Sequence, residues 1–177
     1  MSCQRHNRAY GNTLVTMGQE AQGDKVSHPV SKKLVASVVD REVLASLNFD
    51  PSQLQNDFFD YSKTAVRKPW GYEYLIFQNE LCAVWILYIK KGYQTSMHCH
   101  TSKRTSIAVL SGEAGCYTLD NEIMRHSGEA LLIGEGVFHR TRSISEKGSF
   151  VMEIETPVNK RDLVRFRDDY GRGKMFH

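Results

Sequence analysis

The sequence predicts a mainly β protein, a small barrel of two packed sheets preceded by a short helical segment. From Pro69 onward, the spacing of apolar residues changes from a helical period to a period of two. Short runs rich in Val, Ile, Tyr and Phe then recur at intervals of roughly 8–12 residues, which is typical of a sandwich or barrel. No helical stretch separates these runs, so a parallel α/β sheet is disfavoured.

Length and composition fit one domain with an appendage. The chain has 177 residues, and we divide it into an N-terminal arm with one or two helices, residues 1–66, and a barrel, residues 67–177. The net charge of +3 is too small to indicate nucleic acid, and no apolar run is long enough to span a membrane. No secretory signal is visible at the N-terminus, so we expect a cytoplasmic protein without a nucleic-acid or membrane partner.

The arm is predicted to be helical over Ser31–Leu47, because four of its valines and leucines fall four residues apart. Ser31 can cap the start of this helix. Asp50-Pro51 then predicts a second helix start, with Asp50 as the cap and Pro51 in the first helical position. The apolar stripe of the first helix needs a partner surface. We therefore expect a homodimer, in which residues 1–60 cover a sheet.

The barrel region is predicted to contain at least seven strands separated by turns, and one last helical turn over Leu163 to Asp169. The predicted strands are Tyr72–Phe77, Leu81–Lys90, Ser106–Leu110, Gly115–Leu119, Ala130–Ile133, His139–Ile144 and Phe150–Thr156.

The triplet His98-Cys99-His100 is the most informative short motif. In a strand, residues i and i+2 point to the same face, so the two imidazoles converge on one side and Cys99 faces the other. Such a pair can hold two adjacent coordination positions of a metal ion.

Spaced glycines surround this histidine pair. Gly92 precedes the pair by six residues and Gly112 follows it by twelve, and the segment Gly128–His139 again joins glycines to a histidine. Together these blocks resemble the two motifs of the cupin superfamily, and the resemblance covers about residues 68–157. It implies that the barrel is a double-sheet jelly roll.

The cupin resemblance also implies a metal centre in which His98, His100 and His139 hold one divalent ion, such as Zn, Fe, Ni or Mn. The sequence departs from the family pattern at one ligand. The family's glutamate would fall at Arg104 or Thr105, and neither side chain replaces a carboxylate. Three neutral imidazoles can still hold a metal with open positions. The alternative is a barrel that binds its ligand without metal.

Both flanks of the barrel carry a narrower resemblance. Lys68-Pro69-Trp70-Gly71 at its start and Asp162–Arg172 at its end look like the flanks of the cupin domain of type II mannose-6-phosphate isomerases. The resemblance implies an enzyme similar to an aldose–ketose isomerase, in carbohydrate or polysaccharide precursor synthesis. Its substrate would be a phosphorylated or nucleotide-linked sugar, so the expected partner is a small anionic sugar.

A phosphate ester needs fixed cations or backbone donors. The basic residues that lie nearest by motif position, and that we expect to bind the substrate anion, are Lys68, Lys103, Arg104, Arg140 and Arg172.

An isomerase also needs a base that moves a proton. Glu153 and Glu155 share one face of a predicted strand, and we take them as the candidate catalytic carboxylates. The alternative is that they face water, because the other face, with Phe150, Met152 and Ile154, is apolar and suits a barrel interior.

Two rival functions stay open. A three-histidine Fe(II) site without the glutamate resembles thiol dioxygenases of the same superfamily, although nothing in the sequence indicates a thiol substrate. A cupin that lacks one ligand can also be a non-catalytic sugar-binding or regulatory module. The metal content of the purified protein and its oxygen uptake separate these hypotheses.

Overall fold

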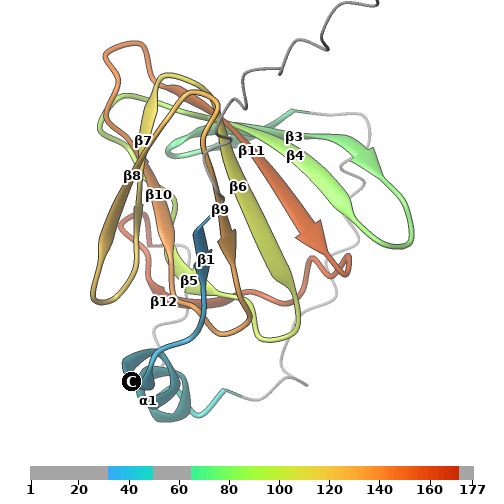
Figure 1. The fold of residues 1–177 in the computed structure, drawn as a ribbon, viewed down its shortest axis with the longest axis vertical. Helices are drawn as coiled ribbons and strands as arrows, with labels where there is room; N and C mark the ends of the chain where they lie inside the picture. Colours follow the sequence, from blue (N-terminus) through green and yellow to red (C-terminus); the bar gives the residue numbers. More distant parts are fainter. Residues whose placement is uncertain (1–31, 50–64, 172–177) are drawn as a thin grey trace, which may run out of the picture.

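The structure is a computed structural model that describes residues 32–49 and 65–171. Its strands form a seven-stranded sheet in the order β1-β9-β6-β11-β4-β3-β2, a three-stranded sheet in the order β10-β7-β8, and the pair β12-β5 (Figure 1). The bounds are β1 (Lys32–Leu34), α1 (Val38–Ser46), β2 (Val66–Lys68), β3 (Gly71–Gln78), β4 (Ala83–Ile89), β5 (Met97–Cys99), β6 (Arg104–Ser111), β7 (Glu113–Tyr117), β8 (Glu122–His126), β9 (Ala130–Ile133), β10 (Arg140–Ser143), β11 (Ser149–Thr156) and β12 (Val164–Arg167).

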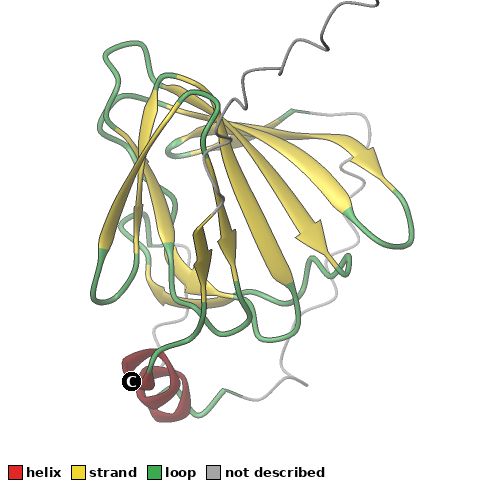
Figure 2. Cartoon of the chain, in the orientation of Figure 1, coloured by secondary structure: helices red, strands yellow, loops and turns green. Residues whose placement is uncertain are grey.

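The predicted mainly β class is confirmed, because strands make up about half of the described residues and α1 is their one helix (Figure 2). The large sheet and the β10-β7-β8 sheet enclose the main core. Strand β4 shows the alternation that builds it: Ala83, Trp85, Leu87 and Ile89 are buried and belong to this core. None of the described helices is long and apolar enough to cross a membrane.

The prediction of a helix from Ser31 to Leu47 is wrong at its N-terminal end. Lys32–Leu34 forms β1 instead, parallel to the free edge of β9. The helix begins after Ser37, whose hydroxyl accepts from Asp40 N at 3.1 Å, while the Asp40 carboxylate accepts from Ser37 N at 2.7 Å. This reciprocal capping box satisfies two backbone N–H groups at the helix start and stops the helix from starting earlier. The predicted helix start at Asp50-Pro51 lies outside the described residues.

The predicted helical turn over Leu163 to Asp169 is also wrong. Val164–Arg167 forms β12, which pairs antiparallel with β5, so that Val164 lies opposite Cys99 and Arg165 opposite His98. The unpaired edge of β5 offers main-chain hydrogen bonds that a single isolated helical turn cannot match. Strand β8 was not predicted either, and it forms a hairpin with β7.

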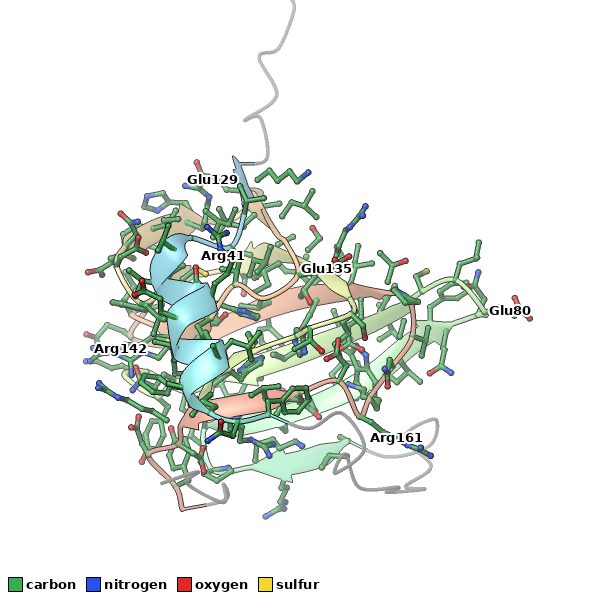
Figure 3. All side chains as sticks on the ribbon, turned by 90° about the horizontal axis from the view of Figure 1, so that it is seen from below. Arg41, Glu80, Glu129, Glu135, Arg142 and Arg161 are labelled. Carbon is green, nitrogen blue, oxygen red and sulfur yellow. The ribbon has the colours of Figure 1, made fainter. Side chains whose placement is uncertain are left out.

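Helix α1 packs against the outer side of the β5-β12 pair. Leu47 joins a second apolar cluster with Met97, Cys99, Phe138 and Val164. Seen from below, α1 crosses the end of the barrel (Figure 3). The buried Asp40 ties the helix to the loop before β10, because its Oδ1 accepts from Phe138 N at 3.1 Å. The helix therefore supports, from behind, the strand that carries His98.

Candidate metal centre

Three histidines from two distant segments meet at the end of the barrel near α1. His98 lies on β5, His100 directly after it, and His139 directly before β10. His98 N donates to His139 O at 3.0 Å and His139 N donates to His98 O at 2.8 Å. The ring centroids are 4.5 Å apart for His98 and His139, and 5.0 Å apart for His98 and His100. The convergence predicted for the His-x-His pair is thus observed, and His139 joins it.

Each of these rings is oriented by a main-chain carbonyl. A carbonyl oxygen only accepts, so each Nδ1 carries the hydrogen and each Nε2 keeps its lone pair. The Nδ1 partners are the carbonyl oxygens of Ser96 (2.7 Å from His98), Val137 (2.9 Å from His139) and Asp162 (bonded to His100). Hydrogen bonds of this kind are the usual outer support of a metal-ligating histidine.

The three imidazoles are neutral at physiological pH. Burial is the main cause that lowers the pKa of His98 and of His100 well below 6.5, and it lowers the pKa of His139 to about 4. Neutral imidazole is the form that binds a metal. One ligand atom from each ring lies within 4.8 Å of the other two. The residues therefore fit one divalent metal ion.

The surroundings of His100 also support a metal ion at this site. The residue is 3% exposed, and its Nε2 has no hydrogen-bond partner among the described residues. A buried polar atom without a partner is costly, and a bound ion removes that cost.

Asp162 holds the turn that follows His100, and sequence reasoning had not singled it out. Its carboxylate accepts from the main-chain N–H groups of Thr101 and Ser102, each at 2.7 Å, and from both hydroxyls at 2.8 and 2.9 Å. Burial alone would raise the pKa of Asp162, but these bonds outweigh it and the pKa is lowered. Since its carbonyl binds His100 Nδ1, one residue fixes both the turn and the ring.

Glu153 and Glu155 face the barrel interior, so the alternative that placed them toward water is wrong. On β11, Val151 and Glu155 are buried, while Phe150, Met152 and Ile154 lie on the other face. Ligand atoms of His100, Glu153 and Glu155 lie within 4.8 Å of one another. The two carboxylates therefore lie beside the histidine cluster.

The two carboxylates differ in their surroundings. Glu155 is 3% exposed, and its Oε1 accepts from Lys103 Nζ at 2.7 Å. Glu153 is half-buried. Burial and the neighbouring Glu155 raise the pKa of Glu153 to about 7.

Comparison with solved structures gives the fold. CapF, a capsular polysaccharide assembling protein from Staphylococcus aureus, matches with a TM-score of 0.54 at 18% identity, over 63% of this chain and 33% of CapF. KdgF from Halomonas sp. matches with a TM-score of 0.52 at 13% identity, over 60% of this chain and 96% of KdgF. A double-stranded β-helix protein from Klebsiella pneumoniae matches with a TM-score of 0.52 at 13% identity, over 65% of this chain and its own full length. The chain has the cupin jelly-roll fold.

The cupin fold is thus the one that the glycine and histidine spacing predicts. At these identities the likeness concerns the fold alone, and the chain spans about a third of the length of CapF. No family model and no curated protein sequence matches the chain.

The cations expected to bind a substrate anion are not gathered at one place in this cupin barrel. Lys103 is 2% exposed and paired with Glu155, and Lys68 Nζ lies 3.0 Å from a Glu73 oxygen. The carboxylate neighbours of these two lysines were not predicted. Each of them neutralises a positive charge that a phosphate would otherwise meet.

Two of the three expected arginines lie in the part of the chain that the structure describes. Arg104 is exposed and its Nε is 3.4 Å from Glu135, a residue labelled in Figure 3. Arg140 lies 5.5 Å from the centre of the Tyr117 ring. Arg172 lies outside the described residues.

Two other cations lie near the histidine cluster and were not predicted as site residues. Arg165 is directly opposite His98 on the neighbouring strand, and its charge contributes to lowering the pKa of that histidine. Lys160 lies 3.2 Å from the centre of the Trp85 ring and 3.6 Å from Glu155. The apolar alternation of Val164 and Phe166 could have indicated a strand that turns Arg165 to the histidine side.

Proposed function

We propose that the protein is a metal-dependent enzyme that moves a proton on a small carbohydrate, as a sugar-phosphate isomerase does. The observation that carries this proposal is Glu153. A ligand atom of its carboxylate lies within 4.8 Å of one of His100, and His100 belongs to the group of three buried imidazoles that fit a metal ion.

A general base works best when its pKa is near the operating pH, because it can both accept and return a proton. A divalent ion bound at the histidines would polarise a carbonyl or hydroxyl of the substrate. Glu153 would take the proton from C2, next to the C1 carbonyl of an aldose, and return it to C1, while the hydroxyl proton of O2 passes to O1, so that the product is the ketose. In the metal-free protein, burial raises the pKa of Glu153 toward the operating pH, and the neighbouring Glu155 carboxylate adds to the shift.

The carbohydrate substrate class is supported by the flanks of the barrel, which resemble those of type II mannose-6-phosphate isomerases. CapF, with the same fold, is a capsular polysaccharide assembling protein. Within the described chain, we propose Arg165 as the contact for a substrate phosphate or other anion, since it lies opposite His98. Lys68 and Lys103 each lie beside a carboxylate within the barrel.

The test is proton exchange. The metal-loaded protein is incubated in D₂O with aldose and ketose phosphates, and NMR follows deuterium at C1 and C2 and the appearance of the isomer. We expect exchange with a phosphorylated sugar, and loss of at least about 100-fold in rate for Glu153→Gln, in keeping with the typical contribution of a general base. Glu146→Gln, at an exposed ion pair with Lys91, is the matched control.

A metal-loaded protein that binds sugar phosphates without exchanging their protons would contradict the enzyme and favour a binding module. Bound iron with oxygen uptake would instead favour the dioxygenase.

A further inference from the structure

We propose that Glu155 is the carboxylate ligand of the metal centre, supplied by strand β11. The inference rests on the metal centre proposed above and adds a ligand from a strand that no cupin motif of this sequence includes. The first reason is the charge balance of the metal centre. Three neutral imidazoles leave both positive charges of a divalent ion uncompensated, and a buried charge without a counter-charge is unfavourable. A nearby buried carboxylate would correct this imbalance.

Two buried polar atoms beside the histidine cluster lack hydrogen-bond partners. Among the described residues, neither His100 Nε2 nor Glu155 Oε2 has a hydrogen-bond partner, and both residues are 3% exposed. Ligand atoms of these two side chains lie within 4.8 Å of each other, and His100 also belongs to the three-histidine group. An ion that binds His100 would therefore lie beside Oε2 of Glu155, a carboxylate oxygen that has no hydrogen-bond partner among the described residues.

Strand register explains why the carboxylate is on β11. Glu155 lies directly opposite Thr105, one of the two positions at which the motif spacing expects a carboxylate. Residues directly opposite on paired antiparallel strands have neighbouring side chains on one face of the sheet. The carboxylate absent from residue 105 is thus present on the adjacent strand, directly across from the expected place. Thr105 itself is 1% exposed, and its hydroxyl has no hydrogen-bond partner among the described residues.

The structure favours Glu155 over Glu153 as the ligand. Lys103 binds Oε1 of Glu155 at 2.7 Å and leaves Oε2 available, and ligating carboxylates are commonly held in this way by a hydrogen bond. Glu153 lies two residues away along β11, opposite Ile107, and is more exposed. The two acids then have separate roles, Glu155 toward the ion and Glu153 toward the substrate.

The experiment compares metal affinity across variants of the full chain. The probes are Zn²⁺, measured in competition with a chromophoric chelator, and Co²⁺, whose visible spectrum reports its coordination. We expect Glu155→Gln to weaken Zn²⁺ binding at least about 10-fold, the lower limit for changes around a metal site, and to change the Co²⁺ spectrum. Glu153→Gln, the matched control, should change the affinity less than about 3-fold and leave the spectrum unchanged.

Removing Glu155 also leaves the Lys103 charge near the ion, so repulsion must be separated from loss of a ligand. Lys103→Met combined with Glu155→Gln removes that charge and avoids a buried unpaired lysine that could impair folding. We expect the double variant to bind Zn²⁺ as weakly as Glu155→Gln. Lys103→Met alone should keep the Co²⁺ spectrum of the unmodified protein.

Unchanged affinity in Glu155→Gln, or full recovery in the double variant, would overturn the assignment. A loss seen only in Glu153→Gln would overturn it in favour of the other acid. His98→Ala separates this result from the fate of the proposed function. If His98→Ala abolishes Zn²⁺ binding and Glu155→Gln does not, the metal centre stands and the assignment of Glu155 fails. If His98→Ala has no effect, the metal centre itself fails.

Discussion

His98 and His139 are joined through their main chains, since each N–H donates to the other's carbonyl, at 3.0 and 2.8 Å. This bridge connects two segments far apart in the sequence and places the two rings 4.5 Å apart, centre to centre. No side-chain atom takes part in it. The arrangement of these two potential ligands is therefore a property of the polypeptide itself, and a metal ion does not have to create it.

The first prediction follows from that bridge. His139→Ala should remove most of the bound metal, with at least about a 10-fold loss of affinity, while the protein still folds because the main-chain bonds remain. Elemental analysis measures the metal, and circular dichroism the fold. His126→Ala is the control, because His126 is exposed and pairs with Glu113 at the surface. Equal metal content in all three proteins would contradict the site.

The second prediction concerns Asp162 and pH. Asp162→Asn should lower the free energy of unfolding by about 1.5–3 kcal/mol at pH 7, because a charge-assisted hydrogen bond from Thr101 or Ser102 is lost. The pKa of Asp162 is lowered in the folded protein, so the folded state favours the ionised carboxylate. This stabilisation is present above the pKa of the unfolded chain, about 3.9, and is lost as the pH falls through the lower folded value.

Urea denaturation of the metal-free protein across pH 3 to 7 is the measurement. The gap between the unmodified protein and Asp162→Asn should narrow toward the acid end. A gap that is constant with pH would show that the charge of Asp162 has no part in stability.

The third prediction concerns the buried ion pair of Lys103 and Glu155. Lys103→Met leaves a buried carboxylate without its partner and should cost about 3–5 kcal/mol of unfolding free energy in the metal-free protein. Adding Glu155→Met removes the unpaired buried carboxylate, so the double variant should regain much of the lost unfolding free energy. Lys91→Met, at the exposed ion pair with Glu146, should change stability by less than about 1 kcal/mol. Additive losses in the double variant would argue against a buried coupling.

The fourth prediction concerns thiol reactivity. Burial raises the pKa of Cys116 to about 12, so the thiol stays protonated across the neutral and mildly alkaline range. In the native protein at pH 8, iodoacetamide should label Cys116 at least about 10-fold more slowly than Cys82, which is only partly buried. Peptide mass spectrometry gives the rate at each site, and denaturant should abolish the difference. Equal native rates would show that the β7 side of the core opens readily.

The sequence by itself determined the class of fold and the three histidines. A period of two, turns at short intervals and the spacing of Gly92 and Gly112 around a His-x-His pair are local patterns, and the second motif adds His139 to that pair. The two helical expectations failed for one reason. Lys32–Leu34 and Val164–Arg167 are strands because the free edges of β9 and β5 accept them, and a free edge exists only after folding.

Only the tertiary structure decided how charges surround the site. Alternation along Ser149–Thr156 defined two faces but not which of them is inside, and the apolar face suggested the wrong answer. The acidic face is inside because Lys103, 52 residues away, meets Glu155 and offsets its burial. The same pairing places Lys103 beside a carboxylate, and the pairing of β12 with β5 brings Arg165 opposite His98. Strand register between distant segments sets these contacts, and register depends on the packing of the whole barrel.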